Sequence, residues 1–136
     1  MADKVDRETR SRTMARVSSK NTPPEMAVRR ALHKAGYRFR LHRKDLPGVP
    51  DVVLPKHKLA IFVHGCFWHQ HQGCRRSVRP TSNTGYWNAK LDRNMARDRA
   101  SVLALQEMGW GSVILWECET LDDALILDRV RAALSA

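Results

Sequence analysis

The stretch of sequence that decides the fold runs Asp51-Val52-Val53-Leu54-Pro55-Lys56-His57-Lys58-Leu59-Ala60-Ile61-Phe62-Val63. Two mainly apolar segments, residues 51–54 and 59–63, flank a polar turn in this stretch. Short apolar runs bounded by turn residues are typical of paired strands, and a continuous apolar run indicates a strand that is buried on both faces. We therefore predict a β-hairpin whose second strand is fully buried.

Helices and further strands are predicted on both sides of the hairpin. Thr22 can cap a helix that has Pro23 in its first turn, has Glu25 at the capping-box distance and ends at Gly36. The remaining predicted elements are a half-buried strand over 37–41, a helix over 86–108, a buried strand over 112–116, and a final helix that is capped by Thr120 with Asp123 and extends through Leu134. This order of elements implies an α/β sandwich around a mixed sheet.

Length and charge bound the domain organisation and the class of partner. A chain of 136 residues fits one compact domain. Residues 1–21 are rich in basic and hydroxyl side chains, so we predict a DNA-binding arm there and a single domain over 22–136. The formal net charge of +10 favours nucleic acid as the partner. A solvated basic surface is the alternative, and membrane binding is disfavoured because no basic amphipathic helix with an aromatic face is present.

The distribution of charged and apolar residues indicates where the protein acts. The chain begins without an apolar signal region, and no stretch approaches the roughly 20 apolar residues that span a bilayer. Basic residues concentrate in the arm and over 75–99, whereas residues 117–128 are acidic. We therefore expect a soluble intracellular protein with one basic face.

A run of histidine and cysteine follows the hairpin directly and reads His64-Gly65-Cys66-Phe67-Trp68-His69-Gln70-His71-Gln72-Gly73-Cys74. Cys66, His71 and Cys74, with the distant Cys118, supply four ligands of the kind that hold a closed, structural zinc ion. His69 is an alternative ligand because its spacing from Cys66 also fits; choosing His71 leaves His69 available for chemistry. Free buried thiols beside surface histidines are the other interpretation.

Four further residues are candidates for catalysis. Asp51 begins the hairpin and His64 ends it, an arrangement that can bring both to one edge of the sheet. A carboxylate suits Mg²⁺, although Asp51 can also be a simple turn residue. His64 and His69 titrate near neutral pH, so either can be a base that deprotonates water, or can be structural. Glu25 can serve the helix cap, a water network near the metal, or both.

With these motifs in place, the chain closely resembles the very-short-patch repair (Vsr) DNA mismatch endonucleases. The resemblance extends over essentially the whole chain. Its motifs are Thr9-Arg10-Ser11 with Met14, Leu46-Pro47-Gly48 followed by Pro50-Asp51, the run from His64 to His69, Tyr86-Trp87 with Lys90, Asn94 and Arg97-Asp98-Arg99, and Trp116-Glu117-Cys118.

The resemblance implies a restriction-endonuclease-like mixed β-sheet flanked by helices, with a structural zinc site. Such nucleases usually carry an acid and a lysine in their second motif, and here that strand reads Phe62-Val63-His64 without either. The family pattern implies that Mg²⁺ is bound by Asp51 and by the backbone carbonyl of Val63. It also implies that His69 activates water while His64 and Glu25 support the water and phosphate network.

The resemblance also implies how a mismatched base pair is contacted. Phe67 and Trp68 would insert as a wedge beside a thymine mispaired with guanine, with Met14 approaching from the arm. Inserted apolar side chains unstack a base step most easily where pairing is already weak. The alternative is that the aromatic pair packs over the zinc site. Lys90 and Asn94 are candidate mismatch or phosphate contacts, with a solvated helix face as the alternative.

The function expected on these grounds is a Mg²⁺-dependent endonuclease that nicks the strand carrying the T of a T·G mismatch, on the 5′ side of that T. Such mismatches arise when 5-methylcytosine deaminates. The expected partners are double-stranded DNA with a T·G mismatch and repair proteins, and the expected form is a monomer in the bacterial cytoplasm, associated with the nucleoid through DNA. The alternatives are a restriction-like or nonspecific DNase and a non-catalytic, zinc-containing DNA-binding module.

Overall fold

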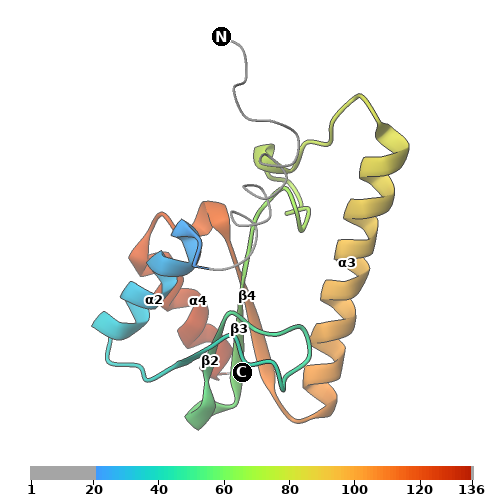
Figure 1. Cartoon of the computed structure of the whole chain (residues 1–136). Coiled ribbons are helices and arrows are strands. Elements are labelled where there is room, and N and C mark those ends of the chain that lie inside the picture. The colour runs from blue at the N-terminus through green and yellow to red at the C-terminus, as the bar shows by residue number, and fades with distance from the viewer. Residues whose placement is uncertain (1–20, 136) are drawn as a thin grey trace.

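The computed structural model describes residues 21–135, which form a four-stranded mixed sheet between helices (Figure 1). The strands lie in the order β1-β2-β3-β4, with bounds β1 Arg40–Leu41, β2 Val52–Leu54, β3 Leu59–His64 and β4 Gly111–Trp116. The helices are α2 Pro23–Lys34, α3 Thr84–Glu107 and α4 Asp123–Ser135. The α/β class is confirmed, whereas the restriction-endonuclease-like relationship stays a prediction. The predicted arm, with Met14, lies outside the described residues except for Asn21.

The hairpin forms as its apolar pattern predicts. β2 and β3 are antiparallel, with Val52 opposite Ile61, and the short 3₁₀ helix Pro55–His57 connects them. β3 pairs on its other side with β4 in parallel, from Leu59 opposite Gly111 to His64 opposite Trp116. A parallel pair needs a long crossover, and α3 provides it. Because β3 and β4 run the same way, the residues that follow them meet at one edge of the sheet.

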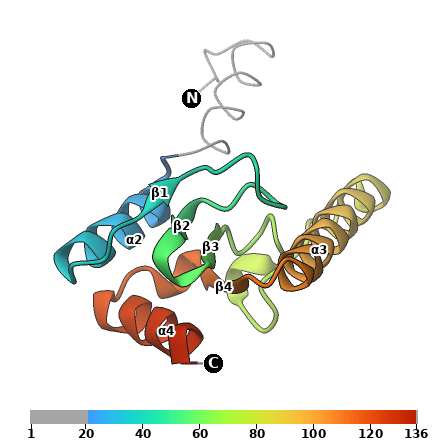
Figure 2. The ribbon, with the colours of Figure 1, turned by 90° about the horizontal axis from the view of Figure 1, so that it is seen from below.

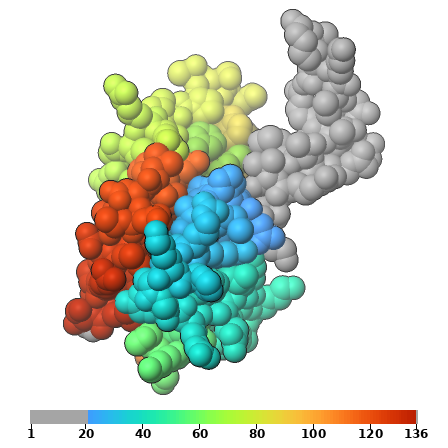
Figure 3. Space-filling model, turned by 90° about the vertical axis from the view of Figure 1, so that its left-hand side faces the viewer, coloured from blue at the N-terminus to red at the C-terminus, as the bar shows by residue number. Residues whose placement is uncertain are grey.

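Helices cover both faces of the sheet, which explains the uninterrupted apolar sequence of β3. Figure 2 shows α2 and α4 on one side of the strands and α3 on the other, and Figure 3 looks onto the face that α2 and α4 form together. On the first side, Leu32 and Ile126 pack with Ile61. On the second side, Leu105 of α3 packs with Phe62. Every residue of β2 and all but Val63 in β3 are buried.

The start of α2 combines two hydrogen bonds. The Thr22 hydroxyl accepts a hydrogen bond from the Glu25 backbone amide at 3.4 Å, and Pro23 opens the first turn. The Glu25 carboxylate in turn accepts a hydrogen bond from the backbone amide of Asn21 at 3.0 Å. The predicted cap at Thr22 is confirmed. The Glu25 side chain binds the amide of Asn21, the residue before the cap.

Two local predictions are wrong. The strand over 37–41 is reduced to Arg40–Leu41, because only these residues pair with β2, while Tyr37 and Phe39 pack partly buried against the core. Thr120 does not cap α4: its hydroxyl donates to the Glu117 carbonyl, and Asp122 accepts from the Ala124 amide at 2.9 Å. The cap therefore lies two residues later than predicted.

The long helix α3 lies mostly outside the core. Its buried residues are Leu91 and Leu105, so its remaining surface is free to form one wall of a groove. Among the helices within residues 21–135, none is both long and apolar enough to span a membrane.

Candidate functional site

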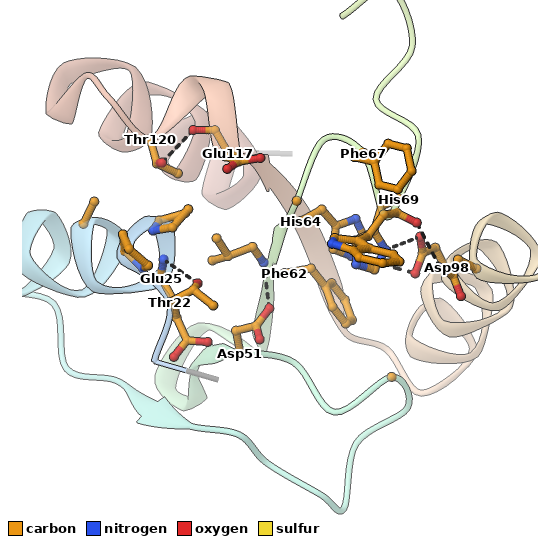
Figure 4. A pocket seen from close by; sticks show the side chains of 18 of the residues that line it. Thr22, Glu25, Asp51, Phe62, His64, Phe67, His69, Asp98, Glu117 and Thr120 are labelled. Atoms are coloured by element: carbon orange, nitrogen blue, oxygen red, sulfur yellow. Dashed lines mark hydrogen bonds and ion pairs between the residues drawn. The ribbon is translucent and has the colours of Figure 1, made fainter. Parts of the chain in front are cut away.

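An open cavity of about 1160 Å³ lies between α2 and α3, at the edge of the sheet where β3 ends (Figure 4). All four candidate catalytic residues line it, together with basic side chains. The lining includes Glu25, Asp51, Val63, His64, Phe67, Trp68, His69, Asp98, Glu117 and the basic residues Arg30, Arg76, Lys90 and Arg97. The prediction that Asp51 and His64 meet at one edge of the sheet is confirmed.

Asp51 is positioned by its neighbours on both sides. Its Oδ2 accepts a hydrogen bond from the Val63 backbone amide at 2.7 Å, across the hairpin. The loop before it packs closely against α3: Gly48 has φ 78°, and a Cβ atom there would lie 2.7 Å from the Ser101 side chain. Only glycine therefore fits this approach. Asp51 is thus held as part of a rigid junction of hairpin and helix.

Burial gives Asp51 an unusual protonation behaviour. Burial raises the pKa of Asp51 to about 6, the hydrogen bond from Val63 opposes this, and the nearby Glu25 carboxylate raises the pKa further. Ligand atoms of Asp51, Glu25 and His42 all lie within 4.8 Å of one another. Two close, buried carboxylates repel when both are ionised, and a divalent cation removes that repulsion. The oxygen-rich donor set therefore fits a hard cation.

His42 is a member of the site that the sequence did not reveal. Its Nε2 lies 3.1 Å from Oε2 and 3.2 Å from Oε1 of Glu25, whose side chain is only 3% exposed. Arg29, one turn along α2, forms an ion pair with the same carboxylate. Glu25 is therefore held by two cationic or polar partners while it caps α2. In the sequence, His42 lies among basic residues of an irregular segment, and no pattern distinguishes it from them.

A second cluster joins two histidines to a carboxylate of α3. The rings of His64 and His69 stack at a centroid distance of 3.8 Å with 7° between their planes. His69 Nδ1 lies 2.7 Å from Asp98 Oδ2, and His64 Nε2 lies 3.9 Å from Asp98 Oδ1. A carboxylate that accepts a hydrogen bond from Nδ1 leaves Nε2 of the same ring as the basic nitrogen. His69 thus has the arrangement of a general base with an orienting partner.

His64 differs from His69 in its environment. It is 5% exposed, and burial lowers its pKa to about 3, with a further decrease caused by the neighbouring His69. Its Nδ1 is buried and has no hydrogen-bond partner within residues 21–135. His64 is therefore neutral at physiological pH and supports His69 through ring stacking.

The cysteines and His71 form a separate group. Ligand atoms of Cys66, His71, Cys74 and Cys118 lie within 4.8 Å of one another, with His71 Nδ1 at 3.4 Å from the Cys118 sulfur and 3.7 Å from the Cys66 sulfur. His71, and not His69, thus lies among the three thiols, and its role as a zinc ligand stays a prediction. Three sulfurs and one imidazole are the donors that tetrahedral zinc prefers.

The surroundings of the three thiols change their pKa values, and these values decide how readily the thiols can bind a cation. Burial raises the pKa of Cys66 to about 12 and also raises that of Cys118, whereas the Arg76 backbone amide lowers that of Cys74. Burial thus favours the protonated thiols of Cys66 and Cys118, and a bound metal would have to displace those protons. The His71 ring is fixed by stacking on Trp116, at 4.3 Å between centroids.

The aromatic pair lies against α3. Ring centroids of Phe67 and Trp68 are 5.5 Å and 6.0 Å from that of Trp87. Lys90 Nζ lies 6.0 Å from the centre of the Trp68 ring, and Asn94 Nδ2 donates to the Trp68 carbonyl at 3.0 Å. The ring that stacks on His71 of the cysteine cluster is that of Trp116.

Three residues of α3 thus contact the aromatic pair. Lys90 and Asn94 are more than a solvated helix face, because each contacts Trp68. Trp87 was named from the sequence only as part of a family motif, and its aromatic partners come from a loop that is distant in sequence.

The chain matches a known family model and several known proteins. The family model "DNA mismatch endonuclease Vsr" matches residues 2–76. The type II nicking enzyme V.XorIIP of Xanthomonas oryzae pv. oryzae is 50% identical over 134 residues, which is 98% of each chain. The DNA mismatch endonuclease Vsr of Escherichia coli K12 is 38% identical and covers 96% of this chain and 86% of its own. The type II nicking enzyme V.NmeAIP of Neisseria meningitidis is also 38% identical, over 96% and 92%.

These similarities define the class: the protein is a DNA endonuclease of the nicking kind. More narrowly, the chain belongs to the DNA mismatch endonuclease Vsr family.

Proposed function

We propose that the protein is a Mg²⁺-dependent endonuclease that nicks the T-bearing strand of a T·G mismatch, on the 5′ side of the T. The observation that carries this proposal is that the Asp51–Val63 pair and the His69–Asp98 pair line the same cavity. A carboxylate for a cation and a base for water are the two groups that phosphodiester hydrolysis needs.

The proposed Mg²⁺ ligands are the Asp51 carboxylate and the backbone carbonyl of Val63. The hydrogen bond between the Val63 amide and Asp51 holds these two residues together. When bound, Mg²⁺ neutralises charge that develops on the phosphate. Glu25, held by Arg29 and His42, borders the same space and would orient water there. A backbone ligand accounts for an apolar side chain at position 63.

His69 is the proposed general base. Asp98 orients its ring through Nδ1, so that Nε2 can take a proton from the attacking water. The neutral His64 stacked on it keeps the ring in place without adding positive charge. Attack in line with the leaving oxygen would then give a nick.

Cys66, His71, Cys74 and Cys118 are the proposed ligands of a structural Zn²⁺. A site with four protein ligands leaves no position for water, so the ion would fix the loop and take no part in hydrolysis. His69 lies between two members of this group in sequence, so a fixed loop also places the proposed base.

Phe67 and Trp68 are the proposed wedge at the mismatch. Both are half-buried and line the cavity, with Lys90 beside Trp68. Insertion of such side chains unstacks a base step at a cost of roughly a few kcal/mol, which is smallest at a mispaired base. The arm over 1–21 is proposed to bind the DNA as well, with Met14 approaching the mismatch from the arm. Repair proteins that act on the nick are the proposed further partners of a monomeric enzyme.

The decisive experiment is strand-specific nicking of end-labelled duplexes that carry T·G or the matched pair, with and without Mg²⁺. We expect a single nick 5′ of the mispaired T, only with the cation. Equal rates on both duplexes would indicate a restriction-like or nonspecific DNase. Tight binding without any nick would indicate a non-catalytic DNA-binding module.

A further inference from the structure

Arg79 connects the loop that carries the aromatic pair to α3. Each nitrogen of its guanidinium group has a different partner: Nε donates to Gln70 Oε1 at 2.8 Å, Nη1 to Asn88 Oδ1 at 2.9 Å and Nη2 to Asp92 Oδ1 at 2.8 Å. Asn88 and Asp92 are one turn apart on α3, and Gln70 belongs to the loop. A planar fork with several fixed donors suits such a junction, and the single ammonium of lysine does not reproduce it.

Gln70 links Arg79 to the backbone of Phe67 through hydrogen bonds of its side-chain amide. Its side-chain amide nitrogen donates to the Phe67 carbonyl at 2.7 Å, while its amide oxygen accepts from Arg79. The residue has φ 54°, in the left-handed region that non-glycine residues seldom adopt. Contacts at both ends of the amide offset the strain of this turn.

Asn94 holds the next residue from another point of α3. Its side chain donates to the Trp68 carbonyl at 3.0 Å. The carbonyls of both aromatic residues are therefore bound by side chains that are anchored on, or belong to, α3. Phe67 and Trp68 lie between Cys66 and His71 in sequence, so the cysteine cluster fixes the ends of this segment while the side-chain contacts fix its middle.

We propose that Arg79, Gln70 and Asn94 form a clamp of positioning residues that orders Phe67 and Trp68 before DNA is bound. The proposal rests on the proposed function for what the pair inserts into. A segment that is already ordered loses less conformational entropy on binding, so the clamp favours insertion at a mismatch. None of the three residues is assigned a part in hydrolysis.

The clamp is expected to act on local order and not on global stability. The Arg79 and Asp92 side chains are 30% and 65% exposed, and an exposed ion pair contributes little to folding. Their joint effect lies in the geometry of one loop, which opens locally without unfolding the sheet.

The test variant is Arg79→Lys, which keeps the charge and removes the fork. The matched control is Arg93→Lys, at an exposed position of α3. Hydrogen exchange is measured on the full metal-loaded chain at the His69 and Gln70 amides, which bond to the Gly65 and Phe67 carbonyls. We expect about tenfold faster exchange in the test variant, since one to two hydrogen bonds are lost, and no change in Tm or in the control.

Nicking is measured on the same proteins with T·G and matched duplexes. We expect the ratio of kcat/KM between the two duplexes to fall about tenfold in Arg79→Lys and to stay unchanged in the control. Asp92→Asn, at an exposed site, is a second variant that weakens the clamp if Arg79→Lys folds poorly.

Each outcome decides a separate point. Unchanged exchange in both clamp variants would overturn the clamp. Faster exchange with an unchanged kcat/KM ratio would overturn its role in mismatch selection. If the unmodified protein itself does not discriminate between the duplexes, the T·G proposal fails, and the exchange data still decide whether the clamp orders the loop.

Discussion

His69 Nδ1 lies 2.7 Å from Asp98 Oδ2, although the two residues are 29 positions apart in the chain. His69 belongs to the loop after β3 and Asp98 to α3, so the packing of that helix decides which nitrogen of the proposed base is free. The histidine and its carboxylate therefore form a single functional unit that two distant segments build.

Removal of this unit is expected to abolish nicking without loss of the fold. His69→Ala should reduce kcat by about 10²–10⁴-fold, the usual contribution of a general base. Asp98→Asn should reduce kcat by a smaller factor because the ring remains but loses its orienting carboxylate. Single-turnover nicking and zinc content are measured together. Loss of zinc from His69→Ala would mean that His69 is a ligand.

The pKa of Asp51 predicts how Mg²⁺ activates the enzyme. Burial raises this pKa to about 6, so the carboxyl group must lose a proton before it binds the cation. The Mg²⁺ concentration for half-maximal nicking should therefore fall as pH rises from 5 to 7 and level off above. Asp51→Asn should remove the Mg²⁺ dependence together with activity. A half-maximal concentration that does not change with pH would contradict a role for this carboxylate.

We predict that the burial of His64 makes the folded protein less stable in acid. Its pKa is lowered to about 3 in the folded protein from an ordinary 6.5, so folding favours the neutral ring. This stabilisation is complete above pH 6.5 and is lost as pH falls toward 3, by about 2 kcal/mol between pH 7 and 5. Urea unfolding at both pH values should show that His64→Phe loses less free energy of unfolding than the unmodified protein. Equal losses would show that folding does not lower the pKa of His64.

We predict that metal binding by Cys118 and its neighbours is coupled to folding. Cys118→Ser should release the metal proposed for the cysteine cluster and lower Tm, because one of its four ligands is lost and metal binding at a closed site is coupled to folding. Metal content by elemental analysis and thermal unfolding are the measurements. His71→Ala should behave alike, whereas His69→Ala serves as the control that keeps the metal.

We predict that Trp68 contributes to the discrimination between T·G and matched duplexes. Trp68→Ala should lower kcat/KM on the T·G duplex by about 10–100-fold, since an aromatic surface that stacks on bases is lost. Trp68→Phe should restore part of it because a flat ring remains. Nicking of matched duplexes is measured in parallel. A uniform decrease on both duplexes would show that Trp68 has only a structural role.

Local patterns explain what was predictable from the sequence. The continuous apolar run of β3 favours a strand that is covered on both sides, and Cys66, His71 and Cys74 are close enough in sequence to lie in a single loop. The cap at Thr22 depends on contacts within four residues. The Thr120 cap was wrong because the Thr120 hydroxyl donates to the Glu117 carbonyl, and the Asp122 carboxylate accepts the hydrogen bond from the Ala124 amide instead.

The sequence by itself determined the α/β order and the buried hairpin and indicated the cysteine cluster, because periodicity and short spacing are local properties of the chain. It left His69 open as an alternative to His71. Only the tertiary structure decided which carboxylate lies against His69, which residues bind Glu25 and which aromatic ring packs against Trp68. Asp98, His42 and Trp87 come from α3 and from an irregular edge segment, where no local pattern marks a partner. Their roles arise when α3 packs across the sheet and brings distant side chains within hydrogen-bond and stacking distance.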